Sequence, residues 1–208
     1  MFTIKQRVKN SSDKAYDFYS YGQIIRNKIP EISNFYILHE GLIADLDDEL
    51  IEEDYDDIQE KKFTKTAQKG WLGIGDKYWI TSLIPPSGKE FKTTFDYKKK
   101  FRANFVSTEP LELKKNSIIE DQIQVIVAAK RVEVIDGYAK SLNIDKFDLA
   151  IDWGFLYFIT KPLFHGIDYF FKLLGNYGLA IIAITFCIRL VFFPLANFSF
   201  KSMAKMKA

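Results

Sequence analysis

The sequence predicts a mainly β fold, a large sandwich of two sheets, followed by an amphipathic helix and one membrane-spanning helix. Across most of residues 1–149, apolar and polar side chains alternate with the period of a strand. Residues 150–176 change to an apolar period of three and four, and residues 177–200 form an apolar run with one charge. Residues 201–208 then end the chain with several lysines.

The composition narrows the classes of function. With 208 residues, of which 48% are hydrophobic, the chain can form one sizeable soluble core and a small membrane portion. The formal net charge is +2 and lysines are spread along the chain, which gives no reason to expect nucleic acid as a direct partner. Cys187 is the only cysteine and lies in the apolar run, so no disulfide framework is expected.

The first strands are expected between Phe2 and about Leu38 as consecutive antiparallel strands. Phe2, Ile4 and Val8 alternate with polar side chains, and turn residues separate the apolar stretches that follow. Residues 40–60 are different, because roughly half of them are Asp or Glu. This density favours a solvated loop or a short helix over a strand. A calcium site is the alternative, although the run lacks the glycine and the ligand spacing of an EF-hand.

The segment GWLGIGDKYWITSLIPP, residues 70–86, predicts a buried strand pair with a bend, ended by Pro85 and Pro86. Its aromatic side chains are interpreted as sandwich core, and a ligand groove lined by Trp71 and Trp79 is the alternative. Further strands are expected around Phe91–Tyr97, Ala103–Phe105 and Ile123–Val127, with a turn at Lys98–Lys100 and a short amphipathic helix after the last strand. That helix is indicated by Val132, Ile135, Tyr138 and Leu142.

Residues 150–176 predict an amphipathic helix whose apolar face is rich in aromatic side chains, a pattern typical of helices in the membrane interface. Packing against the sandwich is the alternative. Asp152 or Thr160 is the expected N-cap, with Pro162 in the first turn and Gly175 near the end. The expected apolar face is Leu156, Ile159, Leu163, Ile167, Phe170 and Leu174, and the polar face is Lys161, His165, Asp168 and Lys172.

Residues 177–200 predict a transmembrane helix, since 24 helical residues reach about 36 Å and a hydrocarbon core is about 30 Å thick. Its single charge, Arg189, falls near the middle, where a charge costs about 2.5 to 3.5 kcal/mol and faces a bundle interior or a watery cavity. A residue that snorkels from a simple anchor helix is the alternative. Three lysines follow, so the positive-inside rule places this end in the cytoplasm and the β part outside it. Export of the β part leads us to expect an anchor upstream.

The residues give no sign of catalysis. His39 and His165 have no obvious partners, and the sequence has no phosphate-binding glycine loop, no nucleophile elbow and no HExxH or CxxC pattern. We therefore predict that the protein is not an enzyme and has no catalytic residue, metal or cofactor.

The order of GWLGIGDKYWITSLIPP, IDWGFLYFITKPLF and GNYGLAIIAITFCIRLVFFPLANFSFKSMAKM resembles the YidC/Oxa/Alb family of membrane insertases over essentially the whole chain. The closing stretch is the most specific part, with an apolar helix, a central arginine, a following proline and SMAKM in sequence. The resemblance implies insertion and folding of integral membrane proteins in the bacterial inner membrane. It also implies that residues 1–149 are the latter part of a periplasmic β-supersandwich and that the apolar helix is the first of five core helices.

The resemblance implies that Arg189 lines a hydrophilic intramembrane groove, with Ile184, Ile188 and Phe192 as contributors to its apolar surface. The implied partners are nascent integral membrane proteins, the lipid bilayer, the Sec translocon and the ribosome. A complete member of the family would also have a signal anchor, the first part of the sandwich and four more core helices, so we expect a fragment that cannot insert substrates alone. The alternative is a single-pass anchored β-domain that binds a ligand such as a sugar, or an envelope partner.

Overall fold

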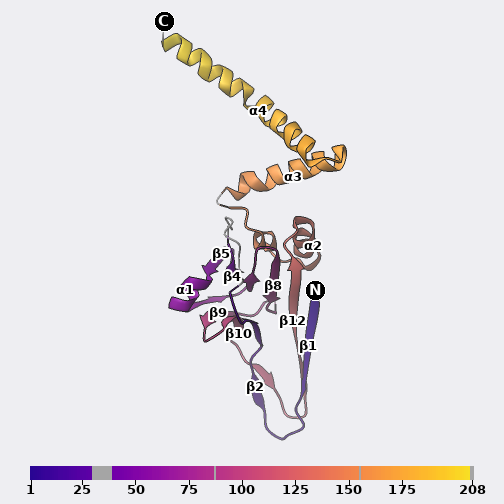
Figure 1. The fold of residues 1–208 in the computed structure, drawn as a ribbon. Helices are drawn as coiled ribbons and strands as arrows, with labels where there is room; N and C mark the ends of the chain where they lie inside the picture. Colours follow the sequence, from indigo (N-terminus) through magenta and orange to yellow (C-terminus); the bar gives the residue numbers. More distant parts are fainter. Residues whose placement is uncertain (30–38, 87, 155, 207–208) are drawn as a thin grey trace. The chain divides into compact units, whose positions relative to one another are not determined.

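The chain divides into two units, Met1–Asp152 and Trp153–Ala208. The computed structural model describes residues 1–29, 39–86, 88–154 and 156–206 (Figure 1). The first unit consists mainly of antiparallel strands and the second of two helices. The mainly β class that the strand periodicity predicts is therefore confirmed.

A sheet of six strands forms one layer of the first unit. Its order is β1-β12-β8-β7-β4-β5, and every neighbouring pair is antiparallel. The strands are β1 (Phe2–Lys9), β12 (Ile118–Ala129), β8 (Trp79–Ile84), β7 (Gly70–Gly75), β4 (Gly41–Leu46) and β5 (Glu49–Asp54).

A second sheet of four strands has the order β3-β10-β9-β6 and is also antiparallel. A separate ladder pairs β2 with β11. The elements are β3 (Tyr21–Arg26), β10 (Phe101–Ser107), β9 (Phe91–Tyr97), β6 (Phe63–Ala67), β2 (Tyr16–Phe18) and β11 (Leu111–Leu113), with the short helix α1 (Tyr55–Glu60) between β5 and β6.

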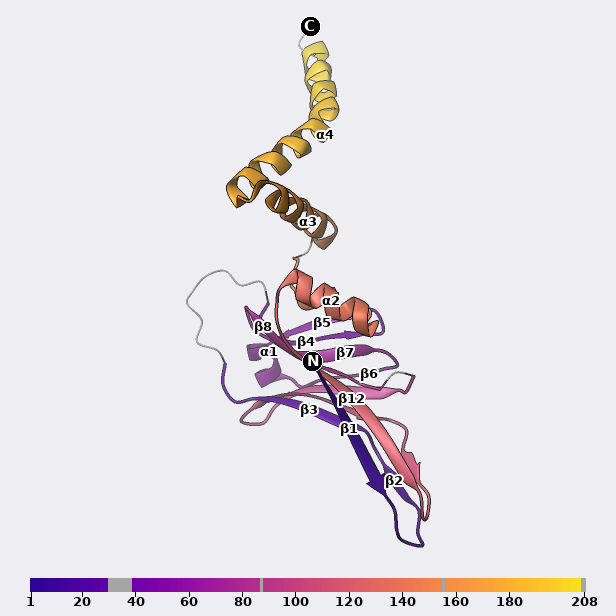
Figure 2. The same ribbon diagram turned by 90° about the vertical axis from the view of Figure 1, so that its right-hand side faces the viewer.

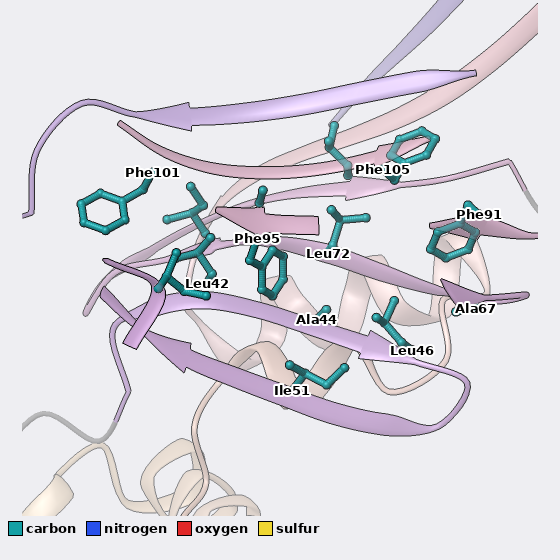
Figure 3. Close-up of a cluster of buried hydrophobic side chains, with 14 of the residues drawn as sticks. Leu42, Ala44, Leu46, Ile51, Ala67, Leu72, Phe91, Phe95, Phe101 and Phe105 are labelled. Carbon is teal, nitrogen blue, oxygen red and sulfur yellow. The ribbon is translucent and has the colours of Figure 1, made fainter. Parts of the chain in front are cut away.

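The apolar sides of these two sheets pack face to face, as the predicted sandwich requires. Strands of both sheets contribute alternate side chains to a single buried cluster. Figure 3 shows this cluster, in which Phe95 and Phe105 of the four-stranded sheet and Leu42 and Leu72 of the six-stranded sheet are fully buried. The alternation seen in the sequence is thus the alternation between this core and the opposite face of each sheet.

The outer face of the six-stranded sheet is covered by the helix α2 (Val132–Leu142), which lies over it in Figure 2, and by the 3₁₀ turn η1 (Phe147–Ala150). Ile135 of α2 and Phe147 of η1 are completely buried there, and Phe147 meets Trp71 edge to face at 5.1 Å between ring centroids. The first unit therefore has a second apolar core on the other side of the same sheet. The helix predicted from Val132 to Leu142 is confirmed.

The acidic run 40–60 is mostly strand, so the expectation of a loop or short helix was wrong for β4 and β5 and correct only for α1. All six residues of β4 are buried. Asp47 and Asp48, both with positive φ, form the hairpin turn between the strands, where such φ values suit the strand twist. The apolar side chains of β4 can be buried, and they determined the structure here. The high average content of Asp and Glu over residues 40–60 concealed them.

The first strands are confirmed as strands, but they do not pair with one another. β1 pairs with β12, β2 with β11, and β3 with β10. The part of this prediction that concerns residues 30–38 lies outside the described residues. Each of these strands thus depends on a partner more than 70 residues away, a pairing that periodicity cannot indicate.

The strand pair predicted at residues 70–86 is confirmed as β7 and β8. Trp71 is fully buried, whereas Tyr78 and Trp79 are 65% and 58% exposed. Assigning all three rings to the core was therefore wrong for Tyr78 and Trp79, which lie at the turn that connects β7 and β8. The two tryptophans also differ too much in burial to line one groove.

The turn at Lys98–Lys100 is confirmed and carries Lys99 in a left-handed conformation, with φ of 63°. Replacing Lys99 with Gly should stabilise the first unit by up to about 1 kcal/mol, because glycine adopts positive φ without steric cost. Thermal unfolding of the full chain in detergent, followed by near-UV circular dichroism, would measure it. Lys100→Gly is the matched control and should be neutral or destabilising. Equal shifts for both variants would contradict this explanation.

In the second unit, the predicted amphipathic helix is α3 (Tyr157–Leu174). It begins later than expected: Leu156 is its N-cap and has no side-chain capping bond, so neither Asp152 nor Thr160 serves as the cap. Pro162 consequently falls in the second turn. The predicted end is confirmed, since Gly175 has φ of 67° and its N–H donates to the carbonyl of Phe171.

Candidate functional site: the apolar helix and Arg189

The apolar run forms the helix α4 (Tyr177–Met206), whose Tyr177–Pro194 portion is long and apolar enough to cross a membrane. Asn176 caps the helix: its side-chain Oδ1 accepts a hydrogen bond from the N–H of Leu179 at 3.2 Å. Pro194 lies inside the helix, where it removes one backbone hydrogen bond. The helix axis changes direction along its length in Figure 2. A membrane-length helix is thus confirmed, and it continues beyond the predicted end at residue 200.

Arg189 is the one charged side chain between Tyr177 and Phe200, and no acidic residue occurs from Tyr177 to the end of the chain. Its side chain is exposed on the helix, and it forms no ion pair with any residue that the structure describes. At about 1.5 Å per residue, it lies about 18 Å along the helix from Tyr177. In a helix that crosses a membrane, a guanidinium this far from the end needs water or an anionic partner from outside the helix.

The other three predicted site residues form one stripe along α4, because neighbours four residues apart are only about 40° apart around the helix. Ile184, at one edge of this stripe, packs against α3, where a Cβ at Gly166 would lie only 2.8 Å from the Cδ1 atom of Ile184. Ile188 is partly buried and Phe192 is 57% exposed. Arg189 is about 60° around the helix from Phe192, about 100° from Ile188 and about 140° from Ile184. Phe192 is thus nearest to the arginine and Ile184 farthest from it.

α3 and α4 are held together by further contacts within the second unit. The rings of Phe171 and Tyr177 stack at 3.9 Å across the connection between the helices.

On the polar face of α3, Lys172 pairs with Asp168 at 2.7 Å. His165 belongs to the same polar face and is exposed. The helical spacing of these groups is as predicted, with a polar row opposite an apolar one.

Several titratable side chains of the first unit form ion pairs or hydrogen bonds with one another. His39 contacts Asp54 at 3.1 Å, and Arg26 pairs with Asp76 at 2.5 Å. Burial lowers the pKa of Lys130, although nearby carboxylates, Asp76 first among them, oppose that shift. No group of three or more His, Cys, Asp or Glu side chains that could hold a metal ion occurs in the described residues. Asp47 and Asp48 of the acidic run instead bind backbone amides and lysines.

One polar residue that the sequence analysis missed is Asp45. It lies within the buried strand β4 and is 2% exposed, and its Oδ2 atom has no hydrogen-bond partner in the part of the chain that the structure describes. The signal available in the sequence was a single carboxylate inside the apolar run Leu42–Leu46. Treating the whole acidic segment as solvated concealed it.

Comparison with known proteins gives two matches that together cover nearly the whole chain. Residues 1–165 match the family described as the YidC periplasmic domain, and residues 169–208 match the family described as the 60Kd inner membrane protein. The resemblance drawn from the closing helix and the segments before it is thereby confirmed.

Individual relatives agree. The chain is 75% identical over 207 residues to the membrane protein insertase YidC of Pelagibacter ubique (strain HTCC1062), covering 100% of this chain and 37% of that protein. It is 40% identical over 214 residues to the protein of the same name from Rickettsia prowazekii (strain Madrid E), and 38% identical over 214 residues to that of Agrobacterium fabrum (strain C58 / ATCC 33970). These two matches cover 100% of this chain and 38% and 36% of the relatives.

The chain thus spans a little over a third of the length of the curated relatives it matches. The matched periplasmic-domain family accounts for the β sandwich, and the matched inner-membrane family accounts for the apolar helix with Arg189. Because the first of these matches alone covers far more than half of the chain, the chain belongs to the YidC family, with periplasmic-domain sequence followed by inner-membrane sequence.

Proposed function

We propose that this chain supplies the periplasmic domain and one intramembrane helix of a membrane protein insertase, which assists insertion and folding of integral membrane proteins. The observation that carries the proposal is Arg189, an exposed cation with no ion pair to the described residues, on a membrane-length helix with no acidic residue. Such a charge is costly in lipid, and intramembrane charges mark polar pathways. Three relatives carry the name membrane protein insertase.

The energies are consistent with a transient partner for Arg189. An acidic residue of an incoming segment costs about 2.5 to 3.5 kcal/mol at the membrane centre. A charge pair at about 4 Å recovers about 4 kcal/mol at an effective dielectric constant of about 20. These amounts nearly cancel, so Arg189 in a water-containing groove would lower the barrier for a polar segment without trapping it. No covalent bond is made or broken, so the activity is not enzymatic.

The apolar part of a substrate would slide along the apolar side chains beside Arg189. Phe192 and Ile188 are the residues of α4 proposed for this contact, because they lie nearest to the arginine among the predicted site residues. The side chain of Ile184 lies against Gly166 of α3, so we assign it to packing between the two helices instead. The proposed groove therefore lies on the side of α4 that α3 leaves exposed.

The proposed topology places the first unit in the periplasm, α3 in the membrane interface and α4 across the inner membrane. Lys201, Lys205 and Lys207 follow the apolar run, which favours a cytoplasmic position for this end. Nascent membrane proteins and lipid are the proposed partners, and the cytoplasmic end would be the side that approaches a ribosome or the Sec translocon.

Site-specific photo-cross-linking tests the proposal. A photoreactive amino acid at Phe192 of the full-length protein should cross-link to a stalled nascent membrane protein. The same probe at Ile184 should instead cross-link within the protein to α3, since Gly166 lies against it. Absence of nascent-chain products at Phe192, or equal yields at both positions, would contradict the proposed groove.

A further inference from the structure

A cavity of about 520 Å³ lies on the outer face of the six-stranded sheet, beside the end of α2. Gln124 of β12 and Ile84 of β8, which lie opposite each other in the sheet, both line it, and so does Asp45 of β4. The volume falls within the range of small-molecule sites. This cavity belongs to the first unit and is separate from Arg189.

Asp45 is the residue that indicates a ligand site in this cavity. It lines the cavity and is 98% buried, yet its Oδ2 atom has no hydrogen-bond partner among the described residues. Leaving such a group unsatisfied costs about 1 to 3 kcal/mol, so an occupant with a hydroxyl group would complete it.

The rim of the cavity is held in place by ion pairs among three turns. Asp48 in the β4–β5 turn pairs with Lys69 at 2.8 Å and with Lys146 at 3.6 Å. Lys69 is also 3.9 Å from Asp145, in the segment that follows α2. Asp47 Oδ1 accepts the N–H groups of Gln68 and Lys69 at 3.0 and 3.1 Å. These contacts connect the three turns that surround the cavity.

The lining combines groups that bind hydroxyls with an apolar wall. Carboxylates accept hydrogen bonds, and side-chain amides both accept and donate them. Ile84, Pro85 and Leu142 supply an apolar wall. Other polar residues that line the cavity are Gln68, Gln122, Gln124, Asn143 and Asp145.

We propose that this cavity binds a small neutral saccharide, with Asp45 as the buried acceptor for its hydroxyl groups. An anion is disfavoured by two lining carboxylates, and a cation by Lys69, which lines the same cavity. A sugar ring has hydroxyls around its edge and apolar C–H faces, which match the amides and the apolar wall. The proposal concerns a site additional to the proposed insertase groove.

Calorimetric titration of the full chain tests the proposal, in a detergent without a sugar headgroup because maltoside would compete. The probes are glucose, maltose, lactose and N-acetylglucosamine, with a neutral tetrapeptide as the non-sugar probe. We expect saturable binding of at least one saccharide. Asp45→Asn should weaken it at least about ten-fold, because hydrogen bonds to a charged acceptor are about twice as strong. Gln124→Ala should weaken it as well.

Asp17→Asn is the matched control, since Asp17 is exposed on β2 and lies outside the cavity lining; its binding should equal that of the natural chain. The proposal is overturned if none of the four sugars saturates, if only the peptide binds, or if Asp45→Asn binds as well as the natural chain. Insertion activity is a separate readout, so failure here would leave the proposed insertase function untouched.

Stability supplies a second readout on the same variant. Burial raises the pKa of Asp45, an effect partly opposed by Lys146 and Lys69 and assisted by Asp48 and Asp145. The folded state thus favours the protonated carboxyl, so stability is lost as pH rises from the ordinary value of 3.8 through the raised pKa. Asp45→Asn should therefore raise the Tm at pH 7 more than at pH 3. A lower Tm at pH 7 would show that Asp45 stabilises the fold, contrary to the proposal.

Discussion

Replacing Arg189 with leucine in the full-length protein should reduce insertion of a substrate with acidic residues in its translocated segment by about ten-fold. A ten-fold change corresponds to about 1.4 kcal/mol, well within the attraction expected for a charge pair at this depth. A substrate with a neutral translocated segment should insert nearly as well as before. Arg189→Lys should retain most of the activity, because it keeps the positive charge. The measurement is protease protection of each substrate in membrane vesicles that contain only the variant insertase.

Arg131→Leu is the matched control for this experiment. It makes the same chemical change at a side chain that is 71% exposed in the first unit, where Arg131 pairs only loosely with Glu133 at 3.5 Å. Both substrates should insert normally with this variant. If Arg189→Leu also inserts both substrates normally, the arginine merely snorkels and α4 is a simple tether, which is the alternative that the sequence left open.

Truncating Phe147 to alanine should destabilise the first unit by about 3 to 5 kcal/mol. Its ring is completely buried against Trp71, and η1 and α2 have no other large aromatic side chain that is fully buried on the sheet. The loss combines transfer free energy with the cavity that remains, and it is a large share of the 5 to 15 kcal/mol typical of a domain. Urea denaturation of the full chain in detergent, followed by near-UV circular dichroism, would measure the free energy of unfolding.

Phe18→Ala is the control, because Phe18 is 38% exposed on the short strand β2. Its cost should be below about 1 kcal/mol. A cost below about 1 kcal/mol for Phe147→Ala as well would indicate that α2 and η1 are only loosely attached to the sheet. The cavity that contains Asp45 would then lack the fixed wall that the proposed saccharide site requires.

Strong local periodicity made several elements predictable. The alternation from Phe91 to Tyr97 is a strand in the structure, and the change of period at Val132 begins a helix. The apolar run likewise predicts α4, because a membrane-length helix needs no long-range information. These segments have one clear period, so local sequence alone determines the type of element.

Features that depend on neighbours were not predictable. The acidic run conceals β4 because Leu42, Ala44 and Leu46 face the sandwich core while charges occupy the turn and the strand that follows. On α4, the sequence could not separate Ile184 from Arg189, since only the packing of Gly166 shows which side α3 covers. Asp45 was missed because its importance lies in an unmet hydrogen bond, which requires the positions of all surrounding atoms.

The pairing of β1 with β12 has a consequence for biosynthesis. Phe2 lies opposite Val125, so β1 waits for β12, which is synthesised more than 100 residues later, before this ladder can form (Figure 1). At about 5 to 20 residues per second, roughly 5 to 22 seconds of translation separate the two strands. Contacts so distant in sequence also raise the contact order and slow folding. During that interval an exposed strand edge bearing Phe2 and Ile4 is open to aggregation, so this sandwich would itself benefit from a holding chaperone as it emerges.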